Sequence, residues 1–148
     1  MVYQWKSGAM VRSDAQTAGE MCQSLADEGR LTAQVLLDAN RPEEAPLHQA
    51  FDWDDSLAAE SWRLHQARNI INSLLIVHEK TEPVRGFFKI ERTEPNYHSV
   101  TAILSSKDSR QKLFDNALRE ILAFQRRYHS LVEFNDVWQA IANLQATK

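Results

Sequence analysis

The chain of 148 residues has the length of one domain, which excludes a large multidomain enzyme. Hydrophobic residues make up 43% of it and charged residues 25%, a mixture typical of a folded protein and not of a disordered one. The formal net charge of −3 excludes a general attraction to nucleic acids or anionic membranes. The charge is nevertheless uneven, because residues 1–60 carry four Lys/Arg against eleven Asp/Glu, and residues 61–148 carry thirteen against nine.

Several features predict a cytoplasmic location. The single cysteine, Cys22, excludes an intrachain disulfide and fits a reducing compartment. The first ten residues include Gln4, Lys6 and Gly8, where a secretory signal needs a continuous apolar core. Apolar runs such as Leu74 to Val77 are far too short to cross a bilayer.

The first 40 residues predict a strand and two helices. Residues 2–6 alternate in polarity and predict a short strand. The capping-box spacing of Ser13 and Gln16 predicts a helix that begins at Ser13, and Gly29 is expected to end it. Thr32 is expected to cap a second, shorter helix.

A proline-containing loop over residues 42–52 separates these helices from a third one. Phe51 and Trp53 are large apolar residues that we expect to fill the core from this loop. Asp54 is a good N-cap for the third helix. The buried face of that helix is expected to hold Leu57, Leu64, Ala67 and Ile71, and its open face Arg63, Gln66 and Asn69.

The rest of the chain predicts strands and then helices. Period-two patterns predict strands at 74–78, 84–91 and 98–104. A long helix over 107–130 follows a cap at Ser105 or Ser106, and a last helix covers about 134–145. The apolar stripe of the long helix is unusually wide, so we expect it to be buried by the rest of the fold, by a partner subunit, or by both.

This order of elements predicts an α+β fold: three N-terminal helices, a small antiparallel sheet, a long C-terminal helix and a short final helix. We expect one domain, 1–148, with a core over 13–92 and a C-terminal helical element over 105–146. Three helices followed by a β-hairpin is the order of a winged helix-turn-helix domain. The long loop before the third helix departs from the tight turn of that motif.

Three segments resemble small uncharacterised proteins of phage and prophage genomes. They are PLHQAFDWDDSLAAESWRLHQARNII from Pro46 to Ile71, YQWKSGAMVRSDAQTAGE near the start, and FQRRYHSLVEF at the end of the long helix. The unusual strings Pro-Leu-His and Phe-Asp-Trp-Asp-Asp carry most of this resemblance. It implies a phage or prophage context and attaches no chemistry to these residues.

No metal or cofactor site is predicted. No two histidines share one helix at spacing i, i+3 or i+4, and a lone cysteine has no partner, so a structural zinc site is not expected. The group Asp52, Asp54 and Asp55 could bind a divalent cation with His48 nearby. The simpler interpretation is that Asp54 caps the helix and its neighbours are solvated.

Catalytic motifs are also missing from the sequence, and we predict a non-enzymatic protein. There is no Gly-x-Ser-x-Gly elbow, no Gly-x-Gly-x-x-Gly loop and no Walker A lysine. Cys22 lies on an apolar helical stripe and is interpreted as a small core residue. An active site assembled from scattered residues is an open alternative.

The basic second half carries the leading hypothesis, a nucleic-acid-associated, DNA-binding protein of phage type. A wing-like hairpin would hold phosphate groups through Arg85, Lys89 and Arg92. The third helix would present side chains of types that read base edges, namely Arg63, Gln66 and Asn69. A mixed charged surface without function is the competing interpretation, and the acidic first turn of the third helix opposes the DNA hypothesis.

The alternative hypothesis is a protein-binding module, such as an inhibitor of a host factor or a phage assembly component. An acidic surface can imitate phosphate or dock on a basic partner. Its contact residues would be Glu43, Glu44, Asp52, Asp54 and Asp55. In either case we expect a homo-oligomer formed through the 107–130 helix.

Overall fold

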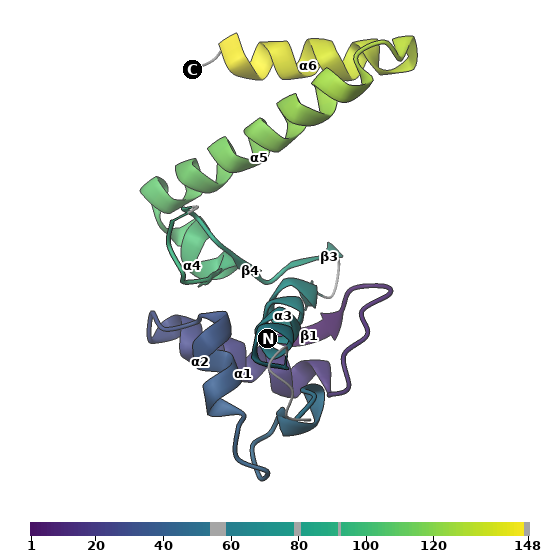
Figure 1. Cartoon of the computed structure of the whole chain (residues 1–148). Coiled ribbons are helices and arrows are strands. Elements are labelled where there is room, and N and C mark those ends of the chain that lie inside the picture. Colours follow the sequence, from purple (N-terminus) through teal and green to yellow (C-terminus); the bar gives the residue numbers. More distant parts are fainter. Residues whose placement is uncertain (54–58, 79–80, 92, 147–148) are drawn as a thin grey trace.

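The computed structural model describes residues 1–53, 59–78, 81–91 and 93–146. Figure 1 shows a compact part, from which a long helix projects and a last helix folds back. We call residues 1–105 the N-terminal unit and residues 107–146 the C-terminal arm. In chain order the elements are β1 (Val2–Trp5), α1 (Ala15–Asp27), α2 (Ala33–Ala39), η1 (His48–Ala50), α3 (Ala59–Ser73), β2 (Leu74–His78), β3 (Thr81–Arg85), β4 (Phe87–Phe88), β5 (His98–Ser99), α4 (Val100–Ser105), α5 (Lys107–Tyr128), η2 (Val132–Phe134) and α6 (Asn135–Ala146). The predicted α+β class, with a long C-terminal helix and a short final one, is confirmed.

The N-cap of helix α1 is Asp14, one residue after the predicted cap Ser13, so the helix begins at Ala15. The carboxylate of Asp14 accepts a 2.8 Å hydrogen bond from the backbone N–H of Thr17. The side-chain oxygen of Gln16 accepts from the backbone N–H of Tyr3 at 3.0 Å and does not reach back to Ser13. The predicted capping box is therefore wrong, and Gln16 instead joins strand β1 to the helix.

The predicted end of α1 and the start of α2 are confirmed. Gly29 has a φ of 68°, the left-handed conformation that commonly follows the last helical residue. The hydroxyl of Thr32 accepts from the N–H of Val35 at 3.0 Å and caps α2. The fully buried Asn40 ends α2, and its side-chain oxygen accepts from the N–H of Leu47 at 3.0 Å. This contact folds the following loop back onto the helix.

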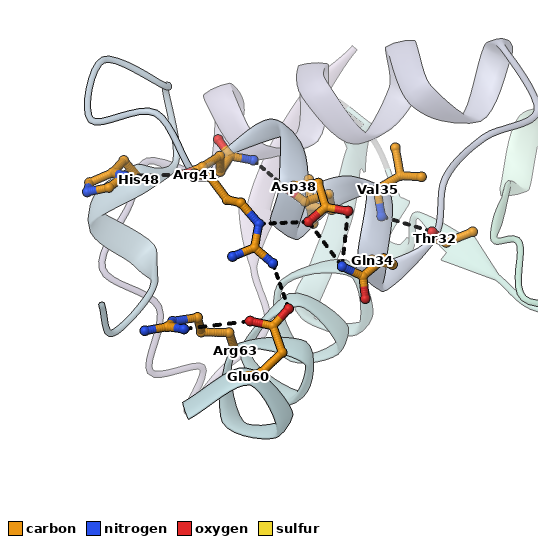
Figure 2. A network of polar contacts seen from close by, with 10 residues as sticks. Thr32, Gln34, Val35, Asp38, Arg41, His48, Glu60 and Arg63 are labelled. Atoms are coloured by element: carbon orange, nitrogen blue, oxygen red, sulfur yellow. Dashed lines mark hydrogen bonds and ion pairs between the residues drawn. The ribbon is translucent and has the colours of Figure 1, made fainter. Parts of the chain in front are cut away.

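A network of ion pairs joins the end of α2 to the start of α3 (Figure 2). Arg41 binds Asp38 at 2.8 Å and Glu60 at 2.6 Å. Glu60 also lies 3.6 Å from Arg63, and Gln34 donates to Asp38 at 3.0 Å. Two carboxylates of the acidic first half, Asp38 and Glu60, are therefore paired with arginines of the same chain.

The N-terminal unit is built on a three-stranded antiparallel sheet of order β1-β2-β3. Tyr3 of β1 lies opposite Ile76 of β2, which in turn lies opposite Val84 of β3. The hairpin of β2 and β3 follows α3 as predicted, but β1 adds a third strand. The α2–α3 connection contains η1 and is longer than a helix-turn-helix turn. The predicted winged-helix arrangement is therefore not confirmed.

The predicted strands 84–91 and 98–104 are both wrong in extent. The chain leaves the first sheet at Gly86, and β4 pairs with β5 in a separate two-stranded sheet. Only His98 and Ser99 are extended, because the Ser99 hydroxyl accepts from the N–H of Ala102 at 3.3 Å and starts helix α4. An N-cap serine thus overrides the strand pattern that follows it.

The two parts differ in how much they bury. Every residue of the hydrophobic core cluster lies between Tyr3 and Tyr97, a wider span than the predicted core over 13–92. Phe51 belongs to this cluster, as predicted. In the arm, α5 buries Leu118 and α6 buries Ile141. Within the described ranges no helix combines the length and apolarity that a membrane span needs.

Candidate nucleic-acid interface

A groove with a volume of about 680 Å³ lies between α5 and the segment from β3 to β5. Cationic, amide and aromatic side chains line it together with two carboxylates. Its lining residues that bear on binding are Asn72, Arg85, Phe88, Lys89, Glu91, Tyr97, Asn116, Arg119, Glu120 and Arg126. We call it the basic groove, because it gathers four cations from two distant parts of the chain.

Arg85 is the most constrained of these cations. Its hydrogen-bond and ring partners are neutral, and the Glu120 carboxylate acts on it electrostatically. Its Nε donates to the carbonyl oxygen of Phe87 at 2.9 Å, and a terminal nitrogen donates to the side chain of Asn72. The guanidinium carbon lies 4.9 Å from the ring centroid of Phe88. Burial lowers the pKa of Arg85, yet an arginine keeps its charge in proteins. The groove therefore holds a positioned positive charge.

Two of the other three cations, Lys89 and Arg119, also have neutral partners. The ammonium nitrogen of Lys89 lies 5.1 Å from the ring centroid of Tyr97. Arg119 donates to the side-chain oxygen of Asn116, and the amide nitrogen of Asn116 donates to the carbonyl oxygen of Ile90 at 2.8 Å. These neutral contacts orient the side chains without neutralising their charge.

Helix α5 supplies its cations from one line along its axis. Lys112, Arg119 and Arg126 are spaced by seven residues, and seven residues turn a helix by about 20° less than two full turns. We call these three residues the basic line. Lys112 is held by Glu91 and Asp108, each at 3.0 Å, and this pairing raises the pKa of Lys112. The remaining two arginines point into the groove.

The charge of the groove is therefore largely unmatched. Among the described residues, no carboxylate lies within ion-pair distance of Arg85, Lys89, Arg119 or Arg126. Of the two lining carboxylates, Glu91 already binds Lys112, which leaves Glu120. An anion such as phosphate fits this arrangement, since several charge-assisted hydrogen bonds can reach it at once.

The structure brings together part of the predicted phosphate-binding set. Arg85 and Lys89 line the groove, and Arg92 lies outside the described residues. Arg119 and Arg126 also line the groove, although the predicted phosphate-binding set came from the hairpin segment and contained no residue of the long helix. The seven-residue spacing of the basic line was the signal that could have found them.

Arg63 is a structural residue, and its predicted place on an open helix face is wrong. Only 6% of its surface is exposed. Its Nε donates to the backbone carbonyl oxygen of Asp52 at 2.7 Å, and its guanidinium carbon lies 5.1 Å from the Trp53 ring centroid. The loop before α3 folds over this face, so Arg63 holds the loop in place and does not face a base edge.

Gln66 and Asn69 are likewise engaged within the fold. The side chain of Gln66 donates to the Asp52 carboxylate at 3.0 Å and accepts from the Asp52 backbone N–H at 3.1 Å. The side-chain oxygen of Asn69 accepts from the Ser73 hydroxyl at 3.3 Å. Gln66 and Asn69 line a separate hollow beside Trp62 and do not line the basic groove.

Only some of the acidic residues that were predicted to contact a partner protein are available for that contact. Asp52 accepts hydrogen bonds from Trp62 at 2.8 Å and Arg12 at 2.6 Å, which hold the pKa of its carboxyl below the usual value. Asp54 and Asp55, including the predicted cap, lie outside the described residues. Two acids of the predicted set, Glu43 and Glu44, lie exposed in the loop before η1.

His48, which was considered as a neighbour of a divalent cation, also makes contacts within the fold. Its ring stacks on Trp53 with the centroids 4.7 Å apart, and its Nδ1 lies 3.1 Å from the carbonyl oxygen of Asn40. No cluster of three or more metal-ligating side chains occurs in the part of the chain that the structure describes. The described residues around His48 therefore serve loop packing.

Comparisons with protein-family models, curated proteins and solved structures found no match for this chain. The resemblance to phage and prophage proteins stays a prediction, and the function has to be argued from the groove.

Proposed function

We propose that this protein binds nucleic acid through the phosphate backbone, which lies in the basic groove. The observation that carries the proposal is the gathering of Arg85, Lys89, Arg119 and Arg126 around one groove. Neutral amides and rings hold three of these cations, so their charge is available to a ligand. Phosphate groups supply most of the affinity of proteins for nucleic acids.

The same contacts favour recognition of the backbone over recognition of the bases. The rings of Phe88 and Tyr97 are covered by Arg85 and Lys89, and Tyr97 is almost fully buried. Bases that stack on a protein need exposed aromatic faces. We therefore expect binding that depends strongly on salt and weakly on sequence.

The test is fluorescence anisotropy with labelled duplex and single-stranded oligonucleotides of about 20 nucleotides over roughly 50–200 mM salt. The double variant Arg119→Gln/Arg126→Gln removes two phosphate contacts. It should weaken binding and reduce the slope of log K against log salt by about 2. The matched control is Lys107→Gln/Arg110→Gln, which removes the same charge from α5 outside the groove.

Two results contradict the proposal: no binding of either oligonucleotide at low salt, or an equal loss in both double variants. The alternative function, docking of a basic protein on the acidic first half, rests on the exposed Glu43 and Glu44. The variant Glu43→Lys/Glu44→Lys separates the two. It should leave oligonucleotide binding unchanged or tighter, whereas it should abolish capture of a basic partner protein.

A further inference from the structure

The C-terminal arm carries a surface on which several large apolar side chains are exposed. Large hydrophobic side chains of the arm are 39–70% exposed. They are Phe114, Ile121, Phe124, Tyr128, Leu131, Val132, Val137 and Leu144. Exposed apolar surface of this extent is typical of an interface and unusual for a surface that faces water.

Part of this surface forms a straight line on α5, opposite the basic groove. Phe114, Ile121 and Tyr128 are spaced by seven residues, as the basic line is. Each lies two residues after a member of the basic line, and two residues rotate a helix by about 200°. The apolar line and the groove thus lie on opposite sides of α5, so both can be occupied at once.

The packing of the arm is incomplete within one chain. Ring contacts join α5 to α6 near the turn, with Phe124 6.1 Å from both Phe134 and Trp138. Beyond the turn the two helices diverge (Figure 1). The indole N–H of Trp138 is buried and has no acceptor among the described residues, whereas buried donors are usually paired. The arm therefore lacks the second layer that a helical hairpin needs.

We propose that the apolar surface of the arm binds the same surface of a second copy of this chain. The α6 side of this surface is poor in charge, because Asp136 is the one charged residue in α6. On α5, Arg127 lies 5.9 Å from the ring centroid of Tyr128, and Lys107 precedes Phe114 by seven residues. The apolar side chains between them can meet those of a second copy with few charged groups in the contact. This inference does not depend on the nucleic-acid proposal.

The available area also suits a dimer. Side chains of roughly 150–250 Å² that are about half exposed offer on the order of 600 Å² per chain. Each partner of a stable interface contributes about 800 Å², so the apolar surface supplies most of what is needed. Two helical hairpins that pack in this way form a four-helix bundle, a common solution for unpartnered hairpins.

The spacing points to an antiparallel, two-fold symmetric pairing centred on Ile121. Phe114 and Tyr128 each lie seven residues from Ile121, so Phe114 of one copy meets Tyr128 of the other. In such an interface the residue on the symmetry axis contacts its own copy. The two basic grooves then lie on the outer sides of the dimer.

Sedimentation equilibrium of the full chain tests the dimer. We expect a dimer at roughly 10 µM and an increase of about 100-fold in the dissociation constant for Ile121→Asp, which places a charge in the apolar contact. Arg119→Asp, on the opposite side of the same helix, should leave the constant within a fewfold of the original. A monomer at all concentrations up to about 100 µM overturns the proposal and indicates a different partner.

Oxidative cross-linking tests the arrangement without a charge change. Ile121→Cys should form a disulfide-linked dimer, because the two residues 121 meet on the axis. Arg119→Cys, which is also exposed but lies on the opposite side of α5, should not form the disulfide-linked dimer in the same assay. The native Cys22 is fully buried and does not compete. Equal cross-linking of the two variants overturns the pairing.

Discussion

In the N-terminal unit, α1, α2 and α3 close on one another and on the sheet, and the core cluster contains side chains from each of them. In the C-terminal arm, α5 is the longest helix of the described chain, yet it buries Leu118 alone. The difference lies in where partners come from. The N-terminal unit supplies its own opposing layers, whereas the arm has one side that lines the basic groove and another on which large apolar side chains are exposed.

The largest test of this difference compares two leucines. Leu36 is fully buried and Leu144 is 46% exposed. Leu36→Ala should lower the free energy of unfolding by about 3–4 kcal/mol, because it leaves a cavity. Leu144→Ala should lower it by less than about 0.5 kcal/mol. Urea denaturation at low protein concentration measures both, and similar losses would show that the arm is part of one cooperative core.

A pair of glycines sharpens the description of the N-terminal unit. A Cβ added at Gly19 would overlap the ring of Tyr3, whereas one at Gly86 would have its nearest neighbours at 3.5 Å. Gly19→Ala should therefore cost about 2–3 kcal/mol, since Tyr3 must move out of its packing position. Gly86→Ala should cost less than about 1 kcal/mol. If thermal denaturation shows equal losses, the contact between α1 and β1 is not as tight as described.

The smallest expected effect concerns alkaline pH. Burial raises the pKa of Cys22 to about 12 from 9.0, and mainly burial raises the pKa of Tyr3 to about 12 from 10.0. The unfolded chain loses these protons first, so stability is full below pH 9 and falls as the pH rises toward 12. Deprotonation of Cys22 in the unfolded chain should lower the free energy of unfolding by about 1 kcal/mol between pH 7 and pH 10. Urea denaturation of the native chain and of Cys22→Ala, each at pH 7 and pH 10, isolates the part of this loss that comes from Cys22. Identical pH dependences of the two proteins would contradict a buried thiol.

Local patterns predicted most helices of the described chain, but not α4, which lies within the predicted strand 98–104. Thr32 and Ser106 cap the helices they were expected to cap, and Gly29 ends α1 in the expected conformation. A cap and its helix lie within a few residues of each other, so the signal is contained in one short segment. The predicted strand over 98–104 failed beyond Ser99, because the Ser99 hydroxyl caps helix α4 and the residues that follow are helical.

The candidate site was predicted only in part, for a related reason. Arg85 and Lys89 of the predicted phosphate-binding set both line the groove. The contribution of Arg119 and Arg126 depends on how α5 leaves the N-terminal unit, which no local pattern specifies. Arg63 was misplaced because the periodicity of α3 cannot show that a loop will cover its polar face.

The uneven charge of the two halves shows most clearly what the sequence alone determines and what only the tertiary structure decides. Composition alone shows an acidic first half and a basic second half, and periodicity alone shows the α+β class. Only the folded chain decides that Asp38 and Glu60 are matched by Arg41, while basic side chains gather in a groove with few carboxylates. The reason is physical: the effect of a charge depends on what lies within a few ångströms of it, and those neighbours are brought together by tertiary packing.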